Sequence, residues 1–220
     1  MKKAFFGGSF DPPHYGHLGV ARAAIDSGKC DQVVWFPAAD PPHKRNRRRA
    51  AFSERMEMVK LTIAQEKAMA VSDFEAKADL HPSYTIDILR KLEETTGERY
   101  ALLIGADSLL SLHTWHRAEE LAETTELITY PRHGAEVSLE KLQEFWEEKT
   151  ARKLLKSMIS GTFFEISSTE MKNSMEKNHF RSNIINEHGL LPGVVDYIRE
   201  KGLYLHEDFM GKSDFKSNSF

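Results

Sequence analysis

The chain has 220 residues, of which 40% are hydrophobic and 29% charged, with a formal net charge of −3. These values are typical of a globular protein with a well-buried core, and they exclude a general electrostatic attraction to nucleic acid. No stretch reaches the roughly 20 apolar residues that a membrane-spanning helix needs. The apolar run near the N-terminus is too short for a signal peptide. We therefore expect a cytoplasmic protein that binds neither a membrane nor nucleic acid.

Strand and helix patterns alternate along the chain. Runs rich in apolar, β-branched and aromatic residues predict strands at Lys2–Phe6, Gln32–Phe36, Ala70–Phe74, Tyr100–Ile104, Leu127–Tyr130 and Thr162–Ile166. Periodic apolar residues predict helices at His17–Ser27, Ser53–Gln65 and Thr85–Thr96. This alternation predicts an α/β fold, a doubly wound (Rossmann-like) parallel sheet with helices on both faces. Ligands bind such folds beyond the carboxyl ends of the strands, so a motif that follows a predicted strand is a candidate site.

Three other features have no chemical signature. The charged segment Ser138–Met158 predicts one long helix, with Leu139, Leu142, Phe145 and Trp146 as anchors. The single cysteine, Cys30, is interpreted as a core thiol rather than a nucleophile, because no motif surrounds it. We assign residues 1–205 to one domain, and we expect residues 206–220, which are polar and lack periodicity, to form a mobile tail.

The strongest motif is the segment Gly7–His17, which follows the first predicted strand. Its paired glycines let the backbone approach a ligand closely, and the helix that follows offers free N–H groups to a phosphate. His14 and His17 lie three residues apart at this helix start, so both can reach the same anion. One alternative is a helix entry loop with two structural histidines. Another is a zinc site completed by His43, although no cysteine or acidic residue has the spacing of a metal ligand.

This segment resembles the signature of the nucleotidyltransferase superfamily, whose His-x-Gly-His motif binds the phosphates of ATP or CTP. The resemblance implies direct attack of a phosphate on the nucleotide α-phosphorus, with no covalent enzyme intermediate. It also implies that His17 stabilises charge on the phosphoryl oxygens and that His14 supports it. The positions that would contact ATP in this segment are Gly8, Ser9, Phe10, His14, Gly16 and His17, and Gly8 and Ser9 would also contact the second substrate.

The loop after the second predicted strand contains Pro-Pro-His-Lys at residues 41–44. It is similar to the substrate loop of the bacterial nicotinate-mononucleotide adenylyltransferases. The resemblance places Lys44, also a candidate catalytic residue, near the phosphates and His43 near the mononucleotide. The basic run that follows, Arg45–Arg49, is interpreted as a solvated loop rather than an attractor of ATP.

Tyr84 and Thr85 lie at the start of the third predicted helix, Thr85–Thr96, and the matching pair in this family lies beside the carboxylate of the pyridine ring. The alternative is that the hydroxyl of Ser83 or Thr85 caps the helix.

Two further motifs follow later predicted strands. Gly105 and Asp107 follow the fourth strand, and the Asp107 carboxylate can accept hydrogen bonds from ribose hydroxyls. Trp115 offers a flat face to a pyridinium ring. A helix N-cap is the alternative for Asp107, and a core anchor for Trp115. Arg132 follows the fifth strand and matches a family arginine, and the resemblance places it, with Asp107 and Trp115, among the residues that contact the mononucleotide.

The last motif, at residues 165–172, resembles the family sequence Ile-Ser-Ser-Thr-x-Ile-Arg. It implies that ATP phosphates bind Ser167, Ser168, Thr169 and Lys172. Lys172 stands where the family has arginine, so it keeps the charge but loses the bidentate fork. The sequence does not decide whether Arg181 compensates.

The resemblance extends from Lys2 to about Tyr204 and includes a nucleotidyltransferase-type fold. It implies an enzyme that transfers AMP from ATP to nicotinate mononucleotide and releases pyrophosphate, a step of NAD biosynthesis. It also implies Mg²⁺ carried by ATP rather than by a protein metal site. The alternatives are an adenylyltransferase for nicotinamide mononucleotide or phosphopantetheine, and a catalytically silent nucleotide-binding protein. The sequence leaves open whether copies of the chain form a homo-oligomer.

Overall fold

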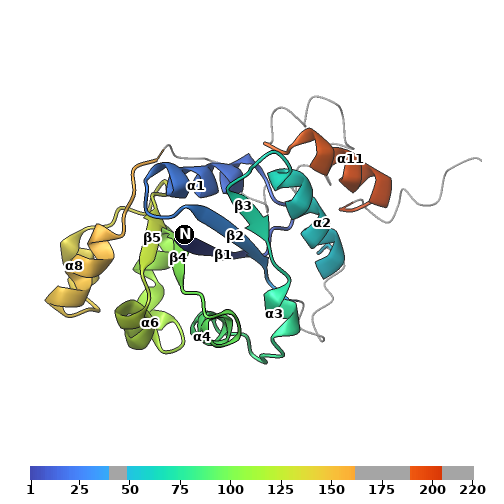
Figure 1. Ribbon diagram of the computed structural model, residues 1–220. Helices are drawn as coiled ribbons and strands as arrows, with labels where there is room; N and C mark the ends of the chain where they lie inside the picture. The colour runs from blue at the N-terminus through green and yellow to red at the C-terminus, as the bar shows by residue number, and fades with distance from the viewer. Residues whose placement is uncertain (40–48, 162–188, 205–220) are drawn as a thin grey trace, which may run out of the picture.

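The computed structural model describes residues 1–39, 49–161 and 189–204, and a five-stranded parallel sheet lies at its centre (Figure 1). The strand order is β3-β2-β1-β4-β5, and every neighbouring pair is parallel. The strands are β1 (Lys3–Gly8), β2 (Gln32–Pro37), β3 (Met69–Val71), β4 (Tyr100–Gly105) and β5 (Leu127–Tyr130). The order reverses between β1 and β4, which makes this point the topological switch of the sheet.

The two strands at the switch point run side by side only at their amino ends. Residues 3–5 of β1 pair with residues 100–102 of β4. Beyond Phe5, β1 stays beside β2 as far as Gly8, and β4 stays beside β5 as far as Gly105. The sheet therefore opens between the carboxyl halves of β1 and β4.

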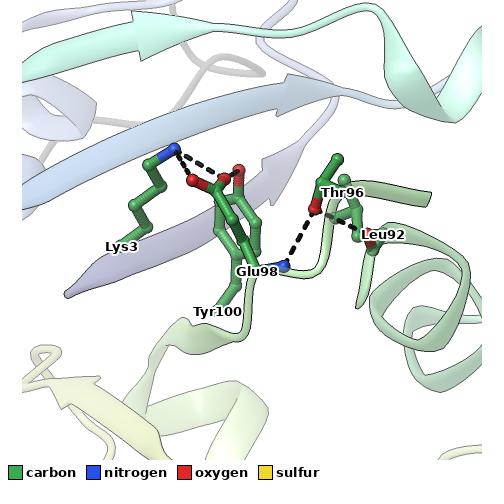
Figure 2. Close-up of polar contacts among 5 residues, drawn as sticks. All are labelled: Lys3, Leu92, Thr96, Glu98 and Tyr100. Atoms are coloured by element: carbon green, nitrogen blue, oxygen red, sulfur yellow. Dashed lines mark hydrogen bonds and ion pairs between the residues drawn. The ribbon is translucent and has the colours of Figure 1, made fainter. Parts of the chain in front are cut away.

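A cluster of hydrogen bonds fastens β1 to β4 at the opposite, amino ends (Figure 2). Lys3 Nζ donates to both carboxylate oxygens of Glu98, at 2.7 and 2.6 Å, and the Tyr100 hydroxyl donates to Glu98 Oε2 at 3.2 Å. The Glu98 N–H donates to Thr96 Oγ1 at 3.2 Å, and the Thr96 hydroxyl donates to the Leu92 carbonyl at 2.7 Å. These bonds join the end of α4 (Thr85–Thr96) to both strands and hold their register far from the open end.

Side chains alternate across the sheet and form one core on each face. Figure 1 shows α1 (Tyr15–Asp26) above the sheet, and α4 and α6 (Ala118–Thr124) below it. The core on the α1 side also receives Val59 and Ile63 of α2 (Phe52–Ile63), and its sheet residues include Ala4, Phe6, Val33, Trp35 and Leu103. The core on the α4 side includes Phe5, Val34, Leu102 and Ile104. The predicted doubly wound fold with helices on both faces is confirmed.

The predicted strands that fall in the described residues are all present, and except for the third their ends lie within two residues of the predicted bounds. The third was predicted at Ala70–Phe74, but β3 ends at Val71 and Phe74 begins α3 (Phe74–Lys77). The chain leaves the sheet because Ser72 Oγ accepts the Phe74 N–H at 3.2 Å and stabilises a turn. The predicted strand Thr162–Ile166 lies outside the described residues, as does the predicted tail 206–220.

The predicted helices are α1, α2 and α4, and α4 has the predicted bounds. The helix predicted from His17 begins earlier, at Tyr15, because His14 is its N-cap.

The prediction of one helix over Ser138–Met158 was wrong. Two helices form, α7 (Leu139–Gln143) and α8 (Glu148–Lys156), and of the predicted anchors Leu142 and Trp146 are buried, whereas Phe145 is 55% exposed. In a continuous helix, the face that buries Leu142 and Trp146 would continue through residues 149, 150 and 153. Two of these three residues are lysines, which would then face the core. The break instead lets α8 bury Ala151 and Leu154.

The remaining helices are short except the last. They are α5 (Ala106–Leu110), the 3₁₀ helix η1 (Leu112–Thr114) and α11 (Pro192–Lys201), which packs on α2 around a third cluster that includes Met58 and Val195 (Figure 1). None of the described helices is long and apolar enough to cross a membrane. Cys30 is buried, as predicted, and burial raises the pKa of its thiol to about 11.

Candidate active site

A cavity of about 570 Å³ lies where the sheet opens, at the carboxyl ends of β1, β4 and β5. Of the residues singled out from the sequence, its lining includes Gly8, Phe10, His14, Gly16, His17, Gly105, Asp107, Trp115 and Arg132. The cavity thus lies at the switch point, where ligands of open parallel sheets bind.

His14 and His17 hold each other in a reciprocal pair at the start of α1. The His17 N–H donates to Nδ1 of His14 at 3.4 Å, and the His14 N–H donates to Nδ1 of His17 at 3.3 Å. The ring centroids are 3.7 Å apart, with 37° between the ring planes. Because each Nδ1 accepts an amide hydrogen, each neutral ring carries its own proton on Nε2. The pair therefore supplies two N–H donors on the ring edges away from the helix backbone.

Burial keeps both imidazoles neutral. Burial, with a smaller contribution from the Arg132 cation, lowers the pKa of His14 to about 3. Burial also lowers the pKa of His17 well below its usual value, with smaller contributions from His14 and Arg132. Aromatic rings produce part of this desolvation, since the Phe6 and Phe10 ring centroids lie 6.2 and 5.2 Å from that of His17. Near pH 7 both rings are therefore neutral, and each offers a hydrogen-bond donor but no positive charge.

Phe10 shapes the loop between β1 and the histidines. Its ring is buried, and its backbone has φ of 47°, a left-handed conformation that is strained for phenylalanine. A Cβ atom on Gly8 would lie 3.0 Å from the Phe10 ring, so a larger residue there would force the ring to shift. The neighbouring Ser9 does not line the cavity, and its carbonyl accepts a hydrogen bond from Arg55 Nη1 at 2.8 Å.

An ion pair lies at the edge of the cavity beside Gly105. Asp107 Oδ1 is 3.6 Å from Arg132 Nε, and both side chains are about half exposed. A Cβ on Gly105 would collide with Asp107 Oδ1 and lie 3.2 Å from Arg132 Nε. Asp107 is the second residue of α5, whose N-cap is Gly105 without a side-chain cap bond. The alternative of Asp107 as an N-cap is therefore wrong.

Trp115 also lines the cavity, and it packs against the core on the α4 side of the sheet. Tyr84 and Thr85 are not part of the lining. Tyr84 stacks instead on His116, with 4.0 Å between ring centroids and 20° between the planes. The stack places Tyr84 beside the residue that follows Trp115.

Capping does not explain the start of α4. Its N-cap is Tyr84, with no side-chain cap bond. The Ser83 hydroxyl donates to Glu75 Oε1 at 3.0 Å, and the same oxygen accepts the Ala39 N–H at 3.2 Å. Burial raises the pKa of Glu75 despite these donors. Glu75 thus joins the loop after β2 to the loop before α4.

Six of the residues singled out from the sequence lie outside the described residues: His43, Lys44, Ser167, Ser168, Thr169 and Lys172. The same holds for Arg45 and Arg181. Within residues 1–39, 49–161 and 189–204, no three histidine, cysteine, aspartate or glutamate side chains lie close enough to hold a metal ion. The zinc alternative required His43 and so cannot be built from the described residues.

Several lining residues were missed. They are mostly strand-end neighbours of the motifs, namely Phe6, Leu103, Ile104, Ser108, Tyr130, Pro131 and His133. The rule that ligands bind beyond strand ends could have found Tyr130 and His133. Val20 follows His17 by three residues, so helical spacing could have found it. Arg55 does not line the cavity, but it is fully buried behind the loop after β1 and was also missed. It could have been found from the sequence because it is a charged residue on the helix face that carries the apolar Val59 and Ile63.

Comparison with known proteins gives a consistent result. The sequence profile of the family described as cytidylyltransferase-like matches residues 5–179. A protein from Gloeobacter violaceus named probable nicotinate-nucleotide adenylyltransferase is 38% identical over 203 residues, which cover 90% of this chain and 94% of that protein. Two solved structures of Plasmodium falciparum nicotinic acid mononucleotide adenylyltransferase share the fold. The one complexed with NaAD has a TM-score of 0.71 at 20% identity and covers 93% of this chain and 98% of its own. The one complexed with APC has a TM-score of 0.70 at 18% identity and covers 92% and 96%.

Proposed function

The chain belongs to the cytidylyltransferase-like family and, within it, to the nicotinate-nucleotide adenylyltransferases, and on this premise we propose that it transfers AMP from ATP to nicotinate mononucleotide. In this reaction a phosphate oxygen of the mononucleotide attacks the α-phosphorus of ATP. A new P–O bond forms, the bond from the α-phosphorus to the bridging oxygen of the β-phosphate breaks, and pyrophosphate leaves. The products are nicotinate adenine dinucleotide and pyrophosphate, so the reaction is a step of NAD biosynthesis.

The observation that carries the mechanism is the pair of fixed Nε2–H donors on His14 and His17. Charge develops on the phosphoryl oxygens during in-line transfer, and donors held in place beforehand stabilise it without reorganising. The depressed pKa values of both rings keep them as neutral donors and free of repulsion between two cations. We assign the larger role to His17, with His14 orienting it.

The other side chains of the cavity divide between the two substrates. We propose that the Arg132 cation attracts phosphate, and that the Asp107 carboxylate accepts hydrogen bonds from ribose hydroxyls once substrate displaces their 3.6 Å ion pair. Trp115 offers its face to the pyridinium ring. Tyr84 and Thr85 at the start of α4 receive the nicotinate carboxylate, since a helix N-terminus favours an anion. The roles of His43, Lys44, Ser167, Ser168, Thr169 and Lys172 stay predictions.

Mg²⁺ is part of the proposal as a companion of ATP. The only carboxylate in the cavity lining is Asp107, and it is paired with Arg132, so the described residues offer no carboxylate set for a resident ion. When bound to the ATP phosphates, Mg²⁺ neutralises charge on the leaving pyrophosphate.

The test is pyrophosphate release from ATP and Mg²⁺ with three acceptors supplied separately: nicotinate mononucleotide, nicotinamide mononucleotide and phosphopantetheine. We expect rapid release with nicotinate mononucleotide alone. Equal turnover of the nicotinamide substrate would discard the assignment of the carboxylate to Tyr84 and Thr85. Release only with phosphopantetheine would discard the proposed acceptor, and ATP binding without release would identify a silent nucleotide-binding protein.

A further inference from the structure

The segment 189–204, which contains α11, contacts the histidine loop on both sides of His14. The Tyr204 hydroxyl donates to Asp11 Oδ1 at 2.6 Å, across 193 positions of sequence. The Tyr15 N–H donates to the Gly189 carbonyl at 2.8 Å. Asp11 precedes His14 and Tyr15 follows it, so the two contacts bracket the N-cap of α1.

Asp11 joins this loop to two other segments of the chain. Its side chain is 3% exposed, and Oδ1 accepts the Ala50 N–H at 3.0 Å as well as the Tyr204 hydroxyl. Burial and the Asp11 carboxylate raise the pKa of Tyr204, so its hydroxyl keeps the proton that it donates. A buried carboxylate needs such donors, and losing one leaves charge poorly compensated.

The chain between Asp11 and His14 has restricted backbone torsions. It consists of Pro12 and Pro13, both buried, whose rings fix φ and remove two backbone donors. Phe10, on the other side of Asp11, has φ of 47°, and Tyr204 itself has φ of 62°. A left-handed backbone at a non-glycine residue persists only where the surrounding structure holds it. Here one such residue precedes Asp11 and the other is Tyr204, so both lie at the Tyr204–Asp11 hydrogen bond.

We propose that Tyr204 is a positioning residue for the adenylyl transfer proposed above, acting through Asp11 on the His14–His17 pair. A shift of Asp11 moves His14 through the two prolines. His14 is joined to His17 by two reciprocal hydrogen bonds, so the Nε2–H donors of both rings move with it. Donors must lie close to the developing charge to stabilise it, and small misplacements are costly. The inference rests on the proposed function only where it predicts a change in kcat.

The test compares Tyr204→Phe with two control variants of α11. Tyr197→Phe is the same chemical change at a ring that lies beneath Lys201 Nζ, at 5.8 Å. Val195→Ala removes buried volume from the cluster between α11 and α2, against which Tyr204 also packs, so it lowers stability while leaving the Tyr204 hydroxyl in place. We expect kcat of Tyr204→Phe to fall about tenfold with both KM values within about twofold, because orientation and not binding is lost. Both controls should keep kcat within about twofold of the parent.

A double variant checks the route. If Tyr204 acts through Asp11, Asp11→Ala combined with Tyr204→Phe should lose no more kcat than Asp11→Ala alone. Multiplying losses would overturn the proposal. So would a normal kcat in Tyr204→Phe accompanied by a lower melting temperature, since that pattern marks a purely structural contact.

A second measurement does not depend on turnover. Amide hydrogen exchange at residues 9–17 should accelerate in Tyr204→Phe and stay unchanged in Tyr197→Phe. Unchanged exchange in both variants would overturn the proposal even if the parent protein has no adenylyltransferase activity. Failure of the parent to release pyrophosphate would instead reject the proposed function and leave the exchange result to decide the positioning role.

Discussion

Arg55 donates from Nη1 to the carbonyl of Ser9 at 2.8 Å, so a fully buried cation lies directly behind the histidine loop. Its Nη2 donates to the Ala38 carbonyl at 2.7 Å, and its Nε donates to the Ala50 carbonyl at 3.2 Å. One guanidinium therefore ties the loop after β1 to the loop after β2. The planar fork of arginine suits three carbonyls that converge from different segments, whereas a lysine ammonium does not reproduce that geometry.

Replacement of Arg55 should be strongly destabilising. Arg55→Met leaves three carbonyls without this donor, and we expect the free energy of unfolding to fall by roughly 2–4 kcal/mol. Arg55→Lys should recover part of this loss. Arg152→Met is the control, because Arg152 forms a surface ion pair with Glu148 on α8 and should cost about 0.5 kcal/mol or less. Urea unfolding of the variants measures all of these values, and an equal loss at positions 55 and 152 would contradict the assigned role.

His17→Ala tests the mechanism. The change removes one Nε2–H donor from the site, and we expect kcat for pyrophosphate release to fall by about 10²–10³. His113→Ala is a suitable control, since His113 stacks on Phe145 at 3.7 Å between centroids and does not line the cavity. Circular dichroism should show that both variants are folded. Near-normal turnover in His17→Ala would remove the proposed mechanism while leaving the reaction itself standing.

The buried histidines should make stability depend on pH. The pKa of His14 is about 3 in the folded protein, against 6.5 ordinarily. Below pH 6.5 the unfolded chain therefore binds a proton that the folded protein does not. The free energy of unfolding then falls as pH is lowered from 6.5 toward 3, by about 1.4 kcal/mol per pH unit for one such group.

His14→Asn is the variant that isolates this contribution, because asparagine can still cap α1. Between pH 6.5 and 5, its unfolding free energy should decline by about 2 kcal/mol less than that of the parent. Urea unfolding at the two pH values measures the difference. Equal declines in both proteins would show that His14 titrates normally in the folded state.

The sequence was sufficient for the fold because the signals of the fold are local. Each strand is an apolar run, and its residues alternate between the two cores, as Phe5 and Phe6 of β1 do. The parallel sheet then directs attention to the strand ends, where Gly8, Gly105 and Arg132 line one cavity. The break between α7 and α8 was not predicted. It depends on how each helix packs against the core, with Trp146 buried before the break and Leu154 buried after it.

The supports of the site were not predictable in the same way. Arg55 lies 46 positions from Ser9, and Tyr204 lies 193 positions from Asp11. A hydrogen bond to a backbone carbonyl places no demand on the identity of the residue that accepts it, so the partner of Arg55 leaves no sequence signal. Tyr84 was singled out from its motif, but its stacking on His116 was not predictable. That contact depends on how α4 packs beside the chain that follows η1.

Gly105→Ala tests the ion pair at the edge of the cavity. A Cβ atom at this position would collide with Asp107 Oδ1 and lie 3.2 Å from Arg132 Nε, so both side chains must shift. Backbone strain is not involved, since φ of Gly105 is −81°. We expect kcat/KM for ATP to fall about tenfold with little loss of stability, because the displaced side chains are half exposed.

Gly193→Ala, in α11, is the matched control. Its Cβ would lie 3.8 Å from Leu61, which is an ordinary van der Waals contact. Alanine also favours helix more than glycine does, so this variant should be as stable as the parent or slightly more stable. Steady-state kinetics with ATP varied, together with thermal melting, give both readouts. Unchanged kinetics in Gly105→Ala would mean that Asp107 and Arg132 can move without affecting the substrates, and the roles proposed for them in binding ribose and phosphate would then be discarded.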